Sequence, residues 1–181
     1  IKGIIPIHFA GLISDIDAIY KIAKENELWI IEDACHAFGG KWRDSSGDEH
    51  RVGDCTFSDM TIFSFHPVKH ITSGEGGAIL TNRKDLYENL LILRNHGMTK
   101  DPEKLIENHG EWYYELHELG FNYRMTDIQA ALENGIRIIF RAHSDNLFLL
   151  RRYDLIKIDN LIDYNEYFLS INLQKYIMSI C

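Results

Sequence analysis

Apolar and polar positions follow a strand, helix, strand order in the first part of the chain. Residues 4–8 and 28–31 are short apolar runs with the length of buried strands. Between them, Ser14 and Asp17 form an S-x-x-D capping pattern, and apolar residues recur behind it at helical spacing, which predicts a helix of about three turns. Two such strands joined by a helix form a right-handed crossover, so the pattern predicts a parallel sheet.

The middle of the chain continues this alternation. Residues 44–53 are polar and predict an exposed loop, whereas 55–65 and 76–81 are rich in residues that favour strands. Leucine and isoleucine then recur at helical spacing over residues 83–96. This pattern predicts a helix that ends at Gly97, because glycine readily adopts the conformation that terminates helices.

The pattern weakens towards the C-terminus. Residues 98–120 are polar and aromatic with little periodicity, and we interpret them as a long loop with some helix. A helix is predicted again over 125–132, capped by Thr126. Beyond residue 134 the chain becomes rich in Ile, Leu, Asn and Tyr, where a helix is predicted around 144–156.

The amino-acid composition limits the kinds of function that the chain can have. The chain has 181 residues, of which 45% are hydrophobic, enough for one sizeable core. A net charge of −8 without a basic block argues against a nucleic-acid partner. Three scattered cysteines (Cys35, Cys55 and Cys181) fit a reducing compartment better than a disulfide framework. No run approaches the ~18 apolar residues of a membrane span, so we expect a soluble, cytoplasmic protein.

Two polar residues lie where chemistry is expected. Asp33 follows the apolar run 28–31 at the carboxyl edge of the predicted sheet, where its carboxylate either pairs with a cation or caps the next turn. Glu32 should point the opposite way and is interpreted as structural. Lys69 lies in FSFHPVKHITSGEGG, where an amine can form a Schiff base while Ser64 and nearby hydroxyls and amides hold a phosphate. A solvated surface lysine is the plain alternative, since no Walker A motif is present.

Two other constellations are weaker. His66 and His70 are four residues apart, but Pro67 between them argues against a helix that presents both to a metal, so no metal site is predicted. Cys35 and His36 are adjacent, whereas a thiol and its base normally come from distant segments. We therefore interpret Cys35 as a packing residue.

Four blocks in order carry a family resemblance. EDACHAFGG, FSFHPVKHITSGEGGAILTN, LRNHGM and GFNYRMTDIQAAL resemble the signature blocks of the DegT/DnrJ/EryC1/StrS sugar aminotransferases, and the likeness covers roughly residues 4–133. The resemblance implies an α/β fold, namely part of the large domain of an aspartate aminotransferase (type I) fold, with a mostly parallel sheet and flanking helices.

The resemblance also implies a cofactor and its ligands. The cofactor would be pyridoxal 5′-phosphate (PLP), with Lys69 as the lysine that holds it covalently and Asp33 as the partner of its ring nitrogen. Ser64 would bind the phosphate, and His36 would lie near the phenolic oxygen. Asn122 would reach the cofactor phosphate of the neighbouring subunit in a homodimer.

The implied reaction transfers an amino group from an amino-acid donor, glutamate, to a nucleotide-linked 4-keto-6-deoxy sugar, in surface-glycan or pseudaminic acid type biosynthesis. Related sugar 3-dehydratases carry histidine where this chain has Lys69, so the lysine favours transamination.

The resemblance divides the chain into two parts. Residues 1–134 match part of the PLP-binding large domain, and 135–181 are interpreted as a divergent or frameshifted helical tail in place of the expected small domain. The chain is thus interpreted as a fragment of a longer enzyme. The alternative is an inactive remnant that binds or regulates a full-length paralogue.

Overall fold

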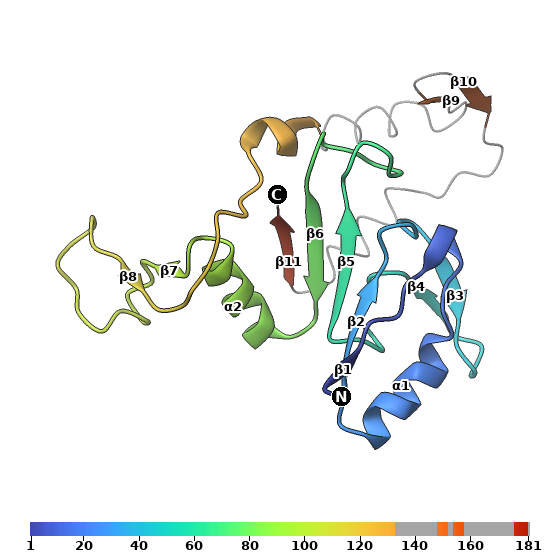
Figure 1. Ribbon diagram of the computed structural model, residues 1–181, viewed down its shortest axis with the longest axis horizontal. Helices are drawn as coiled ribbons and strands as arrows, with labels where there is room; N and C mark the ends of the chain where they lie inside the picture. Colours follow the sequence, from blue (N-terminus) through green and yellow to red (C-terminus); the bar gives the residue numbers. More distant parts are fainter. Residues whose placement is uncertain (133–147, 152–153, 158–175, 181) are drawn as a thin grey trace.

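The central sheet of the computed structural model is parallel on one side and antiparallel on the other (Figure 1). The structure describes residues 1–132, 148–151, 154–157 and 176–180. The sheet has the order β1-β2-β5-β6-β11, with parallel β1–β2 and β2–β5 pairs and antiparallel β5–β6 and β6–β11 pairs. Its strands are β1 (Gly3–Ile4), β2 (Trp29–Asp33), β5 (Met60–Ser64), β6 (Gly77–Thr81) and β11 (Tyr176–Ile180).

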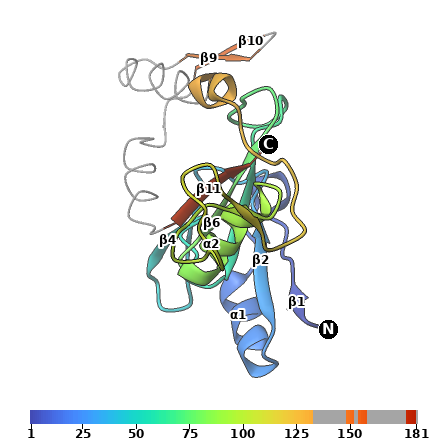
Figure 2. The same ribbon diagram turned by 90° about the vertical axis from the view of Figure 1, so that its left-hand side faces the viewer.

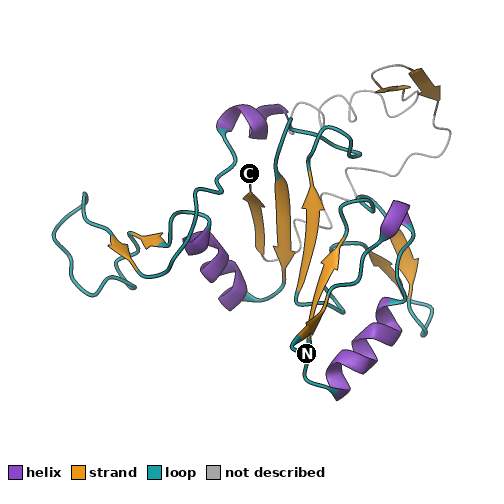
Figure 3. Cartoon of the chain, viewed as in Figure 1, coloured by secondary structure: helices purple, strands orange, loops and turns teal. Residues whose placement is uncertain are grey.

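The two helices that accompany this sheet lie where the sequence predicts them. Helix α1 (Ile16–Glu25) connects β1 to β2, and α2 (Lys84–Leu93) follows β6 (Figure 3). The predicted α/β fold and its parallel crossover are therefore confirmed. The first strand is shorter than predicted, because beyond Ile4 only Ile7 pairs with the sheet, through an isolated bridge to Asp33.

The start of α1 differs from its prediction by one residue. Asp15 is the N-cap, and its carboxylate accepts a hydrogen bond from the Ala18 N–H at 3.1 Å. The hydroxyl of Ser14 donates instead to the Ile7 carbonyl at 3.0 Å, on the side away from the helix. The capping pattern predicted from Ser14 is therefore wrong.

A hairpin replaces part of the loop predicted over 44–53. Strands β3 (Lys41–Arg43) and β4 (Glu49–Arg51) pair in antiparallel register around a turn at 44–48. The ring of His50 in β4 packs on Trp42 in β3 with centroids 4.9 Å apart. This ring contact across the pair stabilises two strands that are otherwise polar. Because the strands lack an alternating apolar pattern, the sequence did not predict them.

Residues 98–125 form an arm that extends from the sheet beyond α2 (Figures 1 and 2). It contains the short strands β7 (Met98–Thr99) and β8 (Glu115–Leu116) and no helix, so the helix expected within 98–120 is absent. Glu115 fixes the arm, because its carboxylate accepts hydrogen bonds from His117 and from the backbone N–H groups of Ile106 and Glu107. These contacts lower the pKa of Glu115 to about 2.

The helix predicted after the arm is confirmed. The Thr126 hydroxyl accepts a hydrogen bond from the Gln129 N–H at 3.3 Å, and helical structure begins at residue 127. Further on, the helix predicted around 144–156 is wrong where the structure describes it: β9 (Phe148–Arg151) and β10 (Asp154–Lys157) pair as antiparallel strands. A short apolar run fits either structure, so periodicity alone chose wrongly here.

The hydrophobic core lies between β2, β5 and β6 and the loops that follow them. Its fully buried members are Ala34, Ala37, Val52, Cys55, Phe63, Phe65, Ala78 and Leu80. Because residues just beyond β2 and β5 are anchored in this core, the carboxyl edge of the parallel strands is held rigidly. Within the described residues, no helix is long and apolar enough to cross a membrane.

Candidate active site

The carboxyl ends of β2 and β5 place two polar side chains on one face of the sheet. Asp33 is the last residue of β2 and pairs in register with Ile62 of β5. Ser64, the last residue of β5, lies two positions further along the same strand. Because side chains two positions apart share a face of a strand, Asp33 and Ser64 face the same side. This edge is where open α/β sheets bind ligands.

The loop over residues 65–76, which carries Lys69, starts from the same edge. Its ends are closed by a hydrogen bond from the Phe65 N–H to the Gly76 carbonyl at 2.8 Å. The Thr72 hydroxyl donates to the Phe65 carbonyl at 2.9 Å, and the Lys69 N–H donates to the His66 carbonyl at 2.9 Å. Lys69 itself is partly buried. A loop bonded to itself in this way holds the lysine close to the end of β5.

The pKa of the Cys35 thiol depends on the charges of both Asp33 and Lys69. Burial, a hydrogen bond to Asp33 and the charge of that carboxylate together raise the pKa of Cys35 to about 11, and the charge of Lys69 opposes this rise. The Asp33 carboxylate also accepts the Cys35 N–H at 3.1 Å. Cys35, interpreted from the sequence as packing, therefore contacts Asp33 and responds to the charge of Lys69.

Alkylation of Cys35 should respond in opposite directions to substitutions of these two residues. Asp33→Asn removes a negative charge, so the Cys35 pKa should fall and alkylation by iodoacetamide at mildly alkaline pH should accelerate. Lys69→Gln removes a positive charge, so the pKa should rise and alkylation should slow. Mass mapping of the Cys35 peptide measures both rates, with buried Cys55 as the internal reference. Rates that shift in the same direction would contradict the arrangement.

Ser64 and His36 follow from the ends of the same two strands. The Ser64 Oγ accepts a hydrogen bond from the His66 N–H at 3.3 Å and, in the described part of the chain, donates none, which leaves its O–H for an anionic ligand. The His36 Nδ1 accepts the Ala10 N–H at 3.3 Å, and its ring packs edge-on against Phe9. His36 is thus held on the loop that follows β2.

Two other hydroxyls that were candidates for binding a phosphate, those of Thr72 and Ser73, form hydrogen bonds within the loop. The Ser73 hydroxyl donates to the Glu75 carbonyl at 2.8 Å, and the Thr72 Oγ, besides donating to Phe65, accepts the Gly74 N–H at 3.0 Å. These two side chains shape the loop. Ser64 remains the hydroxyl at this edge with a proton to donate.

Asn122 lies apart from the other four predicted residues. Its segment runs beside the end of α2, where Asn122 and Asn95 form an isolated bridge, and the residue is exposed. No hydrogen bond joins its side chain to Asp33 or Lys69 in the described residues. Within the described residues, no group of three or more His, Cys, Asp or Glu side chains lies close enough together to hold a metal ion.

One contact at the site was missed by sequence reasoning. The Gln129 Nε2 donates to the Glu75 carbonyl at 3.0 Å and so ties the helix that starts at residue 127 to the Lys69 loop. The two residues are far apart in the chain, and no local pattern could have paired them. This contact joins two of the four signature blocks at the site.

A comparison with models of protein families shows to which family the chain belongs. The DegT/DnrJ/EryC1/StrS aminotransferase family matches residues 1–135. The chain belongs to this family. The solved structures that the chain resembles include aminotransferases, one of them determined in a PLP-form.

Three relatives within this aminotransferase family illustrate the likeness. The UDP-4-amino-4,6-dideoxy-N-acetyl-beta-L-altrosamine transaminase of Campylobacter jejuni is 34% identical over 97% of this chain and 42% of its own. Helicobacter pylori PseC, an aminotransferase involved in the biosynthesis of pseudoaminic acid, matches with a TM-score of 0.60 and 29% identity over 81% of this chain and 40% of its own. The PLP-form of Spr1654 from Streptococcus pneumoniae, assigned as a sugar aminotransferase, matches with a TM-score of 0.63 and 25% identity over 78% and 37%. The chain thus spans about two fifths of the length of these relatives.

The residues at the carboxyl edge fit the cofactor of this family. PLP presents an aldehyde, a phosphate and a ring nitrogen, and the edge offers an amine at Lys69, a hydroxyl proton at Ser64 and a carboxylate at Asp33. Asp33 ends β2, and Lys69 lies in the loop that follows β5 at the same edge of the sheet. The donor set therefore suits an anionic aldehyde with a basic ring nitrogen.

Proposed function

We propose that this chain is the cofactor-binding part of a PLP-dependent nucleotide-sugar aminotransferase. The reaction would move an amino group from glutamate to a nucleotide-linked 4-keto-6-deoxy sugar, as the names of the altrosamine transaminase and PseC suggest for relatives in surface-glycan biosynthesis. The observation that carries the proposal is that Asp33 and Ser64 end the neighbouring strands β2 and β5 and face the same side, at the edge from which the loop with Lys69 starts.

Each residue has a role that follows from its chemistry. When bound, PLP supplies an electron sink that stabilises negative charge on the substrate carbon. Lys69 would hold the cofactor covalently and, as a free amine, take and return the proton of that carbon. Asp33 would keep the ring nitrogen protonated by pairing with its positive charge. Ser64 would donate to the phosphate, and His36 would line the side of the phenolic oxygen.

A homodimer follows from the same proposal. Asn122 would reach the phosphate in the partner's site, in agreement with its exposure and with its bridge to Asn95 next to the end of α2. The arm around it exposes large apolar side chains, including Trp112, Leu119 and Phe121 with 71%, 87% and 58% exposure. A second copy of the chain would cover this surface, since a monomer rarely exposes so many together.

The domain division and location are part of the proposal. Residues 1–134 would form part of the PLP-binding large domain, and 135–181, most of which lie outside the described residues, would be a divergent or frameshifted tail. The free thiols Cys35 and Cys55 suit a reducing compartment, and we place the protein in the cytoplasm.

Covalent trapping tests the proposal directly. The 181-residue chain is incubated with PLP and reduced with borohydride, and its peptides are mapped by mass spectrometry. The expected result is a pyridoxyl group on Lys69. Transfer of ¹⁵N from labelled glutamate to a UDP-linked 4-keto-6-deoxy-N-acetylhexosamine then tests the substrate class. A folded dimer without an adduct on Lys69 would reject the proposal and favour the non-catalytic remnant.

A further inference from the structure

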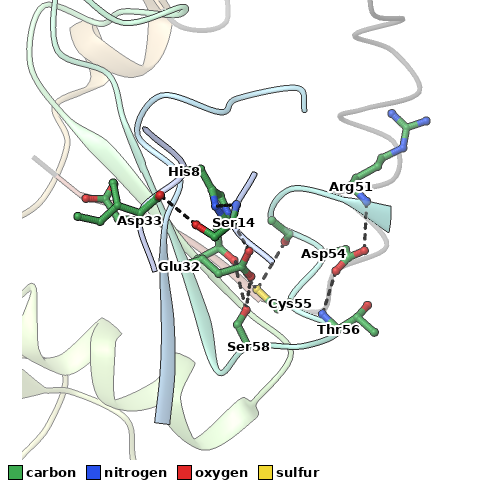
Figure 4. A network of polar contacts seen from close by, with 12 residues as sticks. His8, Ser14, Glu32, Asp33, Arg51, Asp54, Cys55, Thr56 and Ser58 are labelled. Carbon is green, nitrogen blue, oxygen red and sulfur yellow. Dashed lines mark hydrogen bonds and ion pairs between the residues drawn. The ribbon is translucent and has the colours of Figure 1, made fainter. Parts of the chain in front are cut away.

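A buried carboxylate lies directly behind the strand end that carries Asp33. Glu32 is 4% exposed, and its Oε2 accepts a hydrogen bond from the Nε2 of His8, which is 0% exposed, at 2.9 Å. Its Oε1 accepts the hydroxyl protons of Ser58 and Thr61. Figure 4 shows this network with Asp33 next to it in the chain. Because neighbours in a strand point to opposite faces, the network lies on the back of the sheet and Asp33 on the front.

The hydrogen bonds of the His8 ring indicate its tautomer. Its Nδ1 accepts the backbone N–H of Ser14 at 3.3 Å, so this nitrogen carries no proton. The proton of the neutral ring is then on Nε2, which donates to Glu32. The buried carboxylate is thereby satisfied by three neutral donors, and the loss of any one of them leaves part of its charge unpaired.

His8 also holds the backbone of Asp33. The His8 N–H donates to the Asp33 carbonyl at 3.0 Å, and the Asp33 N–H donates to the Pro6 carbonyl at 2.9 Å. The segment 6–8 therefore pairs with Asp33 on the side away from β5. His8 thus bonds both to the backbone of Asp33 and to the buried side chain of Glu32.

We propose that His8 and Glu32 are positioning residues that fix the direction of the Asp33 carboxylate. Segment 6–8 is not part of a named strand, and its bonds to Asp33 are two backbone hydrogen bonds, so the His8 side chain adds a further link to β2. The His8–Glu32 hydrogen bond locks this segment onto the back of β2. The expected effect on cofactor binding rests on the proposed role of Asp33. The positioning of Asp33 by His8 and Glu32 does not depend on that role.

Two substitutions of His8 distinguish the effect of its hydrogen bond to Glu32 from the effect of its packing in the buried interior. The His8→Asn amide keeps an acceptor near the Ser14 N–H but is too short to donate to Glu32. The His8→Gln amide nitrogen reaches the place of Nε2 and restores that donor. Thr81→Val is the matched control, because Thr81 is equally buried and donates to the Asp59 carbonyl at 2.7 Å, outside the His8–Glu32 network.

Hydrogen exchange in the cofactor-free chain is the first measurement. We expect exchange at the Asp33 amide to rise about 10-fold or more in His8→Asn, since a buried hydrogen bond to a charged group is lost, and to return towards the original rate in His8→Gln. Thr81→Val should leave this amide unchanged at a similar loss of thermal stability. Equal exchange at Asp33 in His8→Asn and Thr81→Val would overturn the proposal.

Cofactor affinity is the second measurement. PLP titrations followed by absorbance should show affinity about 10-fold weaker for His8→Asn, with recovery in His8→Gln and no change in Thr81→Val. If His8→Asn does not fold, Ser58→Ala is the variant that tests the proposal. It removes another donor to Glu32 and leaves segment 6–8 unchanged. The Asp33 amide should again exchange faster than in the unsubstituted chain. If the unsubstituted chain binds no PLP, the proposed function fails, while the exchange measurement still supports or overturns the positioning.

Discussion

The Lys69→Arg chain is expected to carry no pyridoxyl group at position 69 after incubation with PLP and reduction with borohydride. Arginine keeps the positive charge in the loop, but its guanidinium does not deprotonate and cannot attack the aldehyde. The loop should remain folded, because its internal bonds involve backbone groups and the hydroxyls of Thr72 and Ser73. The measurement is the mass of the peptide that contains residue 69, together with the visible absorbance of the bound cofactor.

The control for this substitution is Lys84→Arg. Lys84 is an exposed lysine at the start of α2, where it pairs with Glu88 at 3.4 Å. Its replacement should leave the adduct on Lys69 at the level of the unsubstituted chain. Adducts spread over several lysines, with no preference for Lys69 in the unsubstituted chain, would indicate ordinary surface chemistry and contradict the assignment.

The sequence predicted the parallel half of the sheet because its signals are local. The apolar runs that became β2 and β5 are flanked by turn-forming residues, and α1 has an apolar face that needs no distant partner to recognise. The signature blocks also singled out Asp33 and Lys69, because each lies inside a short block whose residues and order along the chain are distinctive.

Spatial relations between distant residues could not be read in the same way. Cys35 looked like a packing residue, but its thiol lies under the influence of both Asp33 and Lys69. His8 is 24 positions from Glu32, and no spacing rule pairs two such residues. The hairpin β3–β4 depends on ring packing of His50 with Trp42 across a polar turn. Each of these contacts is created by the folded sheet, so local patterns carried no sign of it.

Asp33→Asn is expected to weaken PLP binding strongly while leaving the fold intact. The amide has the shape of the carboxylate and its oxygen can still accept the Cys35 N–H, so the turn after β2 should persist. It carries no charge to hold a proton on the ring nitrogen. Loss of a charge-assisted hydrogen bond of ~1.5–3 kcal/mol corresponds to affinity weaker by about 10- to 100-fold. Absorbance titration with PLP measures this change.

The rate of amino transfer should fall by a larger factor than the affinity. A neutral ring nitrogen withdraws electrons poorly, so the substrate carbon would hold its proton even in chains saturated with PLP. Single-turnover reaction with glutamate at saturating PLP separates this effect from binding. Asp59→Asn is the matched control, because Asp59 precedes β5 at the opposite edge and accepts the Ile30 N–H at 3.0 Å. If both substitutions reduced affinity and rate equally, the effect would come from a general loss of stability, and Asp33 would have no special relation to the cofactor.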